Sequence, residues 1–276
     1  MNFSFVVATP EVTQSPIAWV GWSAAVLGEL ARIGYGGVEL QVRDPATIDR
    51  VLLRADLRAA GLDVAGVSTG PISGEDGLYL TAADDAVRKG AVQRLRATVE
   101  LAADLGTHVA IGGVRGTSTW APDRATAMTW LRQGVESVIG RAADLGVPVV
   151  LEPQSRHVTD IFNRVDQTIE FIESIGSPLL GIEADSYHMA IEERSVPAAL
   201  VQVHRAGLLR HVQIGDSNRL APGWGHLNWG DFFATLHALD YTGWVSVESA
   251  QKPDSASAAG QGFRTVSAFE AQCSGS

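Results

Sequence analysis

Residues 211–219 read HVQIGDSNR, an alternating apolar run that ends in an acid, a serine, an asparagine and an arginine. Such alternation is typical of a β-strand, in which successive side chains point to opposite faces. His211 and Gln213 therefore share one face of the predicted strand. The polar residues that follow indicate that this strand leads into a site.

Seven other short runs have the same β-rich character, and helical patterns separate them. The predicted strands are 3–9, 37–42, 63–69, 108–113, 147–153, 180–185, 211–216 and 244–249. Stretches between them, such as 19–34 and 86–106, place apolar residues three and four apart and end in glycine, as amphipathic helices do. Strand–helix alternation repeated eight times predicts an α/β protein of the (β/α)8 TIM-barrel class.

A doubly wound open sheet is the alternative fold. That fold would place a glycine-rich phosphate turn directly after its first strand. The sequence there reads ATPEVTQSP at residues 8–16, without a glycine. The barrel is therefore the preferred prediction.

Composition fits one domain and argues against two classes of partner. The 276 residues, 46% hydrophobic, suffice for a single barrel over residues 1–276. Small polar residues predict a loop-like stretch near 250–262 and a flexible tail from about 271. The net charge of −10, without a basic block, argues against nucleic acid. No apolar run reaches about 18 residues, so we expect no membrane span.

Cysteine content and the first residues bear on the compartment. The single cysteine, Cys273, leaves no disulfide framework, which fits a reducing environment. Residues 1–12 lack the charged and long apolar regions of a signal peptide. We therefore expect a cytoplasmic location.

Polar residues stand where four consecutive predicted strands end. Glu152, Asp185, Gln213 and Glu248 occupy these positions on strands that are otherwise mostly apolar. In a TIM barrel, such strand ends form the active site. Any one of these residues alone could be a helix cap or an ion-pair partner. Three carboxylates converging on one axis, however, need a cation.

The quoted strands and their flanks resemble the xylose isomerase-like TIM-barrel superfamily, in its sugar-phosphate isomerase and ketose 3-epimerase branch. The resemblance covers nearly the whole chain. Its most specific pieces are VVLEP (149–153), ADSYHMAIEE (184–193), DSNRLAPGWGHLNW (216–229) and WVSVES (244–249).

The resemblance implies a divalent metal held by Glu, Asp, His and Glu from the last four strands. These positions fall on Glu152, Asp185, Gln213 and Glu248. It also implies substrate binding by His188 and Arg219. In the family the two glutamates move protons on opposite faces of the substrate, which makes Glu152 and Glu248 the catalytic candidates here.

The chain departs from the family pattern at two places. Gln213 stands where the family has its metal-binding histidine, and His211 lies two residues deeper. Where the family has Asn-Arg-aromatic-Glu, residues 155–158 read SRHV. A carboxylate that helps to bind substrate is therefore absent, and His157 appears beside its position.

The glutamine changes the expected metal chemistry. Its amide oxygen is a neutral, hard donor, so the predicted ligands form an all-oxygen set. Such a set suits Mn²⁺ best, with Mg²⁺ or Co²⁺ as alternatives, and matches zinc poorly. The opposing hypothesis is that Gln213 abolishes metal binding and the chain is inactive.

A metal site of this kind favours enolisation of a keto-sugar. Histidine titrates near pH ~6.5, so His157 is a candidate acid/base group. A changed metal shell with a histidine also resembles the catalytic subunits of C-glycoside deglycosidases in this superfamily. Those enzymes use a divalent metal, act on 3-keto C-glycosides and pair with a small β-rich subunit.

We therefore predict β-elimination that cleaves the C–C glycosidic bond of a 3-keto C-glycoside. The alternative is a ketose or keto-sugar 3-epimerase or isomerase. The expected partners are a sugar or glycoside substrate, further copies of the chain in an oligomer, and for the lyase a small β-rich second subunit.

Two other classes of function stay open. A non-enzymatic sugar- or metal-binding barrel would need no acid/base pair. An apurinic-site endonuclease would need inward histidines and a basic face, which a chain of net charge −10 does not offer.

Overall fold

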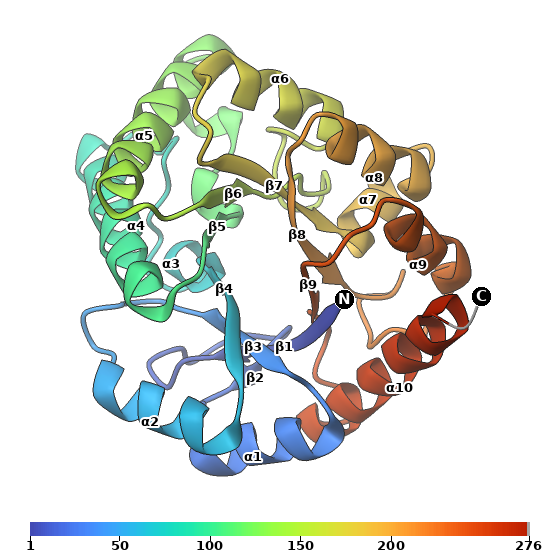
Figure 1. Cartoon of the computed structure of the whole chain (residues 1–276). Coiled ribbons are helices and arrows are strands. Elements are labelled where there is room, and N and C mark those ends of the chain that lie inside the picture. The colour runs from blue at the N-terminus through green and yellow to red at the C-terminus, as the bar shows by residue number, and fades with distance from the viewer. Residues whose placement is uncertain (275–276) are drawn as a thin grey trace.

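Short apolar strands form a closed parallel barrel in the computed structural model, which describes residues 1–274 (Figure 1). Eight of the nine strands pair in series, the last of them with the first, and close the barrel. The remaining strand has two residues and pairs only with the first barrel strand. The barrel strands are β1 Asn2–Ala8, β3 Gly37–Gln41, β4 Asp63–Ser68, β5 Val109–Ile111, β6 Val149–Leu151, β7 Leu180–Asp185, β8 Leu209–Ile214 and β9 Trp244–Val247. The predicted (β/α)8 class is confirmed.

Helices surround the barrel and cover the outer face of its strands (Figure 1). They are α1 Ala24–Ile33, α2 Arg50–Ala60, α3 Gly70–Gly74, α4 Asp85–Leu105, α5 Arg124–Leu145, α6 Val165–Ile175, α7 Ser186–Glu192, α8 Val196–Arg205, α9 Trp229–Ala238 and α10 Ser255–Ser274, with the 3₁₀ turns η1 Gly113–Arg115 and η2 Ser118–Trp120. Within residues 1–274, none of these helices has the length and apolar character needed to cross a membrane.

Local capping explains where the long helices begin and end. Asp84 accepts a hydrogen bond from the Ala86 amide and begins α4. Gly106 ends the same helix with a φ of 69°, a left-handed conformation that glycine adopts at little cost. These sharp boundaries return the chain to the barrel after each helix.

The barrel interior is polar along part of its length. His211 of β8 bonds to Glu39 of β3, and Ser246 of β9 bonds to Ser4 of β1. Because β3 and β8 are not neighbours in the sheet, the first of these bonds crosses the barrel interior. Buried polar groups in such a place must be paired or must bind something.

Two sequence predictions were wrong in detail. Residues 255–262, expected to be loop-like, belong to α10, which continues through the predicted tail to Ser274; residues 275–276 lie outside the described part. A small residue lets this helix pack closely on the barrel, because a Cβ at Gly262 would lie 2.9 Å from Val247 on β9. The stretch 19–34, expected to be one helix, begins instead with a two-residue strand, β2 Trp19–Val20.

Candidate active site

The four predicted ligands come together at the carboxyl ends of consecutive strands. Glu152 follows β6, Asp185 ends β7, Gln213 lies in β8 and Glu248 follows β9. All four are at most 6% exposed. Three of them, Glu152, Gln213 and Glu248, line a cavity of about 360 Å³, together with His188.

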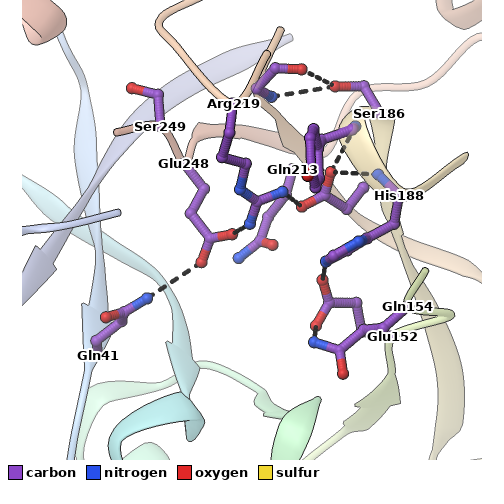
Figure 2. A network of polar contacts seen from close by, with 12 residues as sticks. Gln41, Glu152, Gln154, Ser186, His188, Gln213, Arg219, Glu248 and Ser249 are labelled. Carbon is purple, nitrogen blue, oxygen red and sulfur yellow. Dashed lines mark hydrogen bonds and ion pairs between the residues drawn. The ribbon is translucent and has the colours of Figure 1, made fainter. Parts of the chain in front are cut away.

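Arg219 occupies the space between two of these carboxylates. Its guanidinium donates to Asp185 Oδ2 at 2.8 Å and to Glu248 Oε2 (Figure 2). The same group lies 4.6 Å from the centre of the Tyr187 ring. The backbone of Arg219 has a φ of 63°, an uncommon value for a residue with a side chain. Such strain persists where the surroundings fix the conformation.

Asp216 holds the loop that presents Arg219. Its carboxylate accepts hydrogen bonds from the amides of Gly223 and Leu227 and from the indole of Trp229. Its backbone carbonyl accepts from the Arg219 amide at 2.8 Å. This strand-end acid therefore organises the loop and does not line the cavity, unlike Glu152 and Glu248.

Glu152 is fixed by two residues that the sequence did not reveal. Gln154 donates to Glu152 Oε2 at 2.7 Å (Figure 2). Arg115 in turn donates to Gln154 Oε1 at 3.1 Å. Arg115 is only 1% exposed, and removing its charge from water costs free energy. Its hydrogen bonds to Gln154 and to the Glu152 carbonyl offset part of this cost. Gly112 permits the close packing, because a Cβ there would lie 2.5 Å from Glu152 Oε2.

The hydrogen bonds of His188 fix its tautomer. The amide of Ser155 donates to Nδ1 at 3.2 Å, so Nδ1 carries a lone pair and the proton of the neutral ring is on Nε2. That nitrogen lies 3.5 Å from Glu152 Oε1. Burial lowers the pKa of His188 to about 4, which keeps the ring neutral. His188 therefore presents one N–H donor to the cavity.

Burial and like charge raise the pKa of both glutamates. For Glu152, burial and then the charges of Asp185 and Glu248 hold the pKa well above its usual range. Burial raises the pKa of Glu248 to about 8, against the opposing charge of Arg219. Raised carboxyl pKa values at opposing positions are characteristic of acid/base sites.

Gln213 is oriented by a residue deeper in the barrel. Its side-chain Nε2 donates to Glu39 Oε1 at 2.6 Å. Its Oε1 has no hydrogen-bond partner among residues 1–274 and remains available to the cavity. His211 bonds to Glu39 as well and points below the cavity, so it does not replace the missing histidine ligand.

The donor set fits a divalent cation. Carboxylate oxygens of Glu152 and Asp185 and a ring nitrogen of His188 lie within 4.8 Å of one another. When ionised, the three carboxylates against Arg219 leave an excess of two negative charges. Oxygen-rich, anionic surroundings of this kind suit Mn²⁺ or Mg²⁺.

His157 does not line the cavity. It is exposed, at the turn in which Arg156 pairs with Glu192 at 2.7 Å. Of the predicted catalytic residues it is the one that the structure does not bring to the carboxylates. Its neighbour Val158 does line the cavity.

Known proteins resemble this chain in sequence and in fold. A family model described as xylose isomerase-like TIM barrel matches residues 27–267. A ketose 3-epimerase of Arthrobacter globiformis is 32% identical over 218 residues, which cover 78% of this chain and 73% of that protein. An L-ribulose 3-epimerase of Mesorhizobium japonicum is 31% identical over 239 residues, covering 83% and 78%.

A solved structure agrees with the fold. The crystal structure of a D-allulose 3-epimerase from Methylomonas sp. superimposes with a TM-score of 0.79 and covers 98% of both chains. At 23% identity, this similarity supports the barrel fold alone.

Proposed function

We propose that this chain, which belongs to the xylose isomerase-like TIM barrel family, is a divalent-metal-dependent epimerase of keto-sugars. The chain is an enzyme of that superfamily, as its relatives are sugar epimerases. The finer assignment concerns the reaction: inversion of the carbon next to a carbonyl, with Glu152 and Glu248 as the two proton carriers.

One observation carries the proposal. Glu152 and Glu248 are both buried, both have raised pKa values, and both line the same cavity. Glu152 follows β6 and Glu248 follows β9, and the strands β7 and β8 lie between these two in the barrel. A substrate between them therefore has one carboxyl on each face. An epimerase needs this arrangement, because one group removes a proton and the other returns one.

The other side chains would bind and orient the substrate. The N–H of His188 and the guanidinium of Arg219 are donors for sugar oxygens. Glu152, Asp185, Gln213 and Glu248 would hold the cation, for which we propose Mn²⁺. The ion supplies charge stabilisation for the oxygens next to the reacting carbon. Glu152, steadied by Gln154, would exchange its proton on one face, and Glu248, held by Gln41 at 3.1 Å, on the other.

The sequence favoured C–C bond cleavage, but the relatives favour epimerisation. The names of the two relatives describe ketose epimerases. The histidine on which the cleavage hypothesis relied, His157, is exposed. We therefore prefer epimerisation. Cleavage of a 3-keto C-glycoside, for which we expected a second subunit, is the competing outcome of the experiment below.

Proton exchange with solvent tests the function. Purified protein with Mn²⁺ is incubated in D₂O with L-ribulose, D-allulose or a 3-keto C-glucoside. We expect deuterium next to the carbonyl and formation of the epimer for at least one of the sugars. Free aglycone without epimer would favour the lyase, and no exchange with any of them would favour a non-enzymatic binding barrel.

A further inference from the structure

A second cluster of metal-ligating side chains lies inside the barrel, below the cavity. Donor atoms of His108, Glu183 and His211 all lie within 4.8 Å of one another. Glu39 joins them, because its Oε2 is 2.9 Å from His211 Nε2. The rings of His108 and His211 have centres 4.7 Å apart, with their planes tilted by 53°. The cluster therefore offers two imidazoles and two carboxylates.

Two of these donor atoms are buried without a hydrogen-bond partner. Glu183 Oε2 and His108 Nε2 make no hydrogen bond within residues 1–274. Glu183 is 1% exposed and His108 is 9% exposed. An unpaired buried carboxylate is costly, so native structures pair such groups or use them to bind an ion. Because a ligand atom of His108 lies within 4.8 Å of one of Glu183, a single cation would bind both residues.

Charge and protonation favour a divalent ion in this space. Glu39 and Glu183 supply two negative charges when ionised, which one such ion balances. Burial and then the charge of Glu39 raise the pKa of Glu183 well above its usual range, so a bound ion would displace its proton. Burial, and then the charge of His211, lowers the pKa of His108 to about 3, so its ring is neutral and able to act as a ligand. Metal bonds of about 2.1 Å place neighbouring donors roughly 3.4 Å apart, so the donor atoms, now within 4.8 Å of one another, need to approach by at most about 1.4 Å.

The cluster lies between two hollows, because Glu183 lines the sugar cavity and His108 lines a hollow at the opposite end of the barrel. His108 lines a hollow of about 440 Å³ on that side, together with Val64, Arg210 and Trp244. These residues lie at or near the starts of strands.

We propose that His108, Glu183 and His211, with Glu39, form a second site for a divalent transition metal, separate from the one at the strand ends. The two imidazoles favour Zn²⁺, Co²⁺ or Ni²⁺, unlike the oxygen donors above them. Glu39 links the two sites, because its other oxygen holds Gln213 at 2.6 Å. The inference rests on the buried cluster and not on the proposed reaction.

Metal stoichiometry tests the second site. Chelator-stripped protein is dialysed against Zn²⁺ alone, and bound metal per chain is measured by mass spectrometry of the elements. Because zinc prefers the imidazole site, we expect about one equivalent for the wild type and for Glu152→Gln/Glu248→Gln, and about none for His108→Asn/Glu183→Gln. His204→Gln, at an exposed histidine, is the control and should keep about one.

X-ray absorption identifies the ligands of the remaining zinc. In Glu152→Gln/Glu248→Gln, we expect the scattering pattern of imidazole. A wild type that binds no zinc would overturn the site, and this result needs no variant to fold. Absence of zinc from Glu152→Gln/Glu248→Gln, or zinc there without imidazole, would overturn it too.

Discussion

Gln154 donates a hydrogen bond of 2.7 Å to Glu152, its neighbour but one in the chain. The bond holds a buried carboxylate that like charges surround, and Arg115 holds the glutamine in turn. A neutral amide thus orients this glutamate. Glu152 can keep a fixed orientation although residue 158 is a valine.

Gln154→Ala tests this support. Without the donor, the pKa of Glu152 should rise further, and the ionised form should become rarer at neutral pH. We expect kcat to fall about 10–100-fold and the acidic limb of the pH–rate profile to move to higher pH. Steady-state kinetics across pH measures both. Gln202→Ala, at an exposed position, should change neither, and an unshifted limb in Gln154→Ala would contradict the role.

His157→Gln separates the two sources of acid/base chemistry. If Glu152 and Glu248 carry the protons, the rate of epimerisation should stay within about threefold of wild type, because His157 is exposed and outside the cavity. A fall of about 10²–10⁴ would instead support the catalytic histidine that the sequence suggested. Turnover and metal content should be measured on the same preparation.

The stability of the metal-free protein should depend on pH through Glu248. Its pKa is about 8 in the folded chain and near ~4.3 when unfolded, so folding favours the protonated form. The resulting stabilisation is complete below the unfolded pKa and is lost as pH rises through about 8.

We therefore expect the melting temperature of chelated protein to fall by about 5 °C between pH ~6 and ~8.5, measured by calorimetry. Glu248→Gln should flatten this dependence, since an amide does not titrate. Excess Mn²⁺ should also flatten it. A melting temperature that rises over the same range would show that other groups dominate.

Gln213→His tests whether residue 213 binds the metal. A histidine supplies a nitrogen ligand and removes the amide that now bonds to Glu39. Preference should shift from Mn²⁺ toward Co²⁺, Ni²⁺ or Zn²⁺, by about tenfold in relative affinity in titration calorimetry. Gln202→His is the matched control on the surface. Unchanged preference in Gln213→His would place residue 213 outside the metal's ligands.

Local patterns in the sequence were enough to predict the barrel and the strand-end residues. Two-residue periodicity marks each strand, and parallel strands in a barrel carry their ends to one face. The sequence therefore predicts that four strand-end residues lie together, namely Glu152, Asp185, Gln213 and Glu248. Their grouping follows from strand position alone, without knowledge of packing.

Contacts between distant segments were not predictable in this way. Arg115 and Glu39 act on residues 37 and 174 positions away, and nothing local distinguishes them from other charged residues. Helix α10 was missed because its serines, alanines and glycines read as a loop. Close packing on β9, which needs such small residues, decides its structure instead.

Proton exchange by the two single variants tests the central claim most directly. A ketose and its C3 epimer are incubated separately in D₂O with Glu152→Gln or Glu248→Gln, and deuterium at C3 is followed by NMR. If the two glutamates act on opposite faces, each variant should exchange one epimer at a measurable rate and lose about 10²–10⁴ in exchange of the other, with the affected epimer reversed between variants. Loss of exchange for the same epimer in both variants, or wild-type epimerisation by either, would contradict the account.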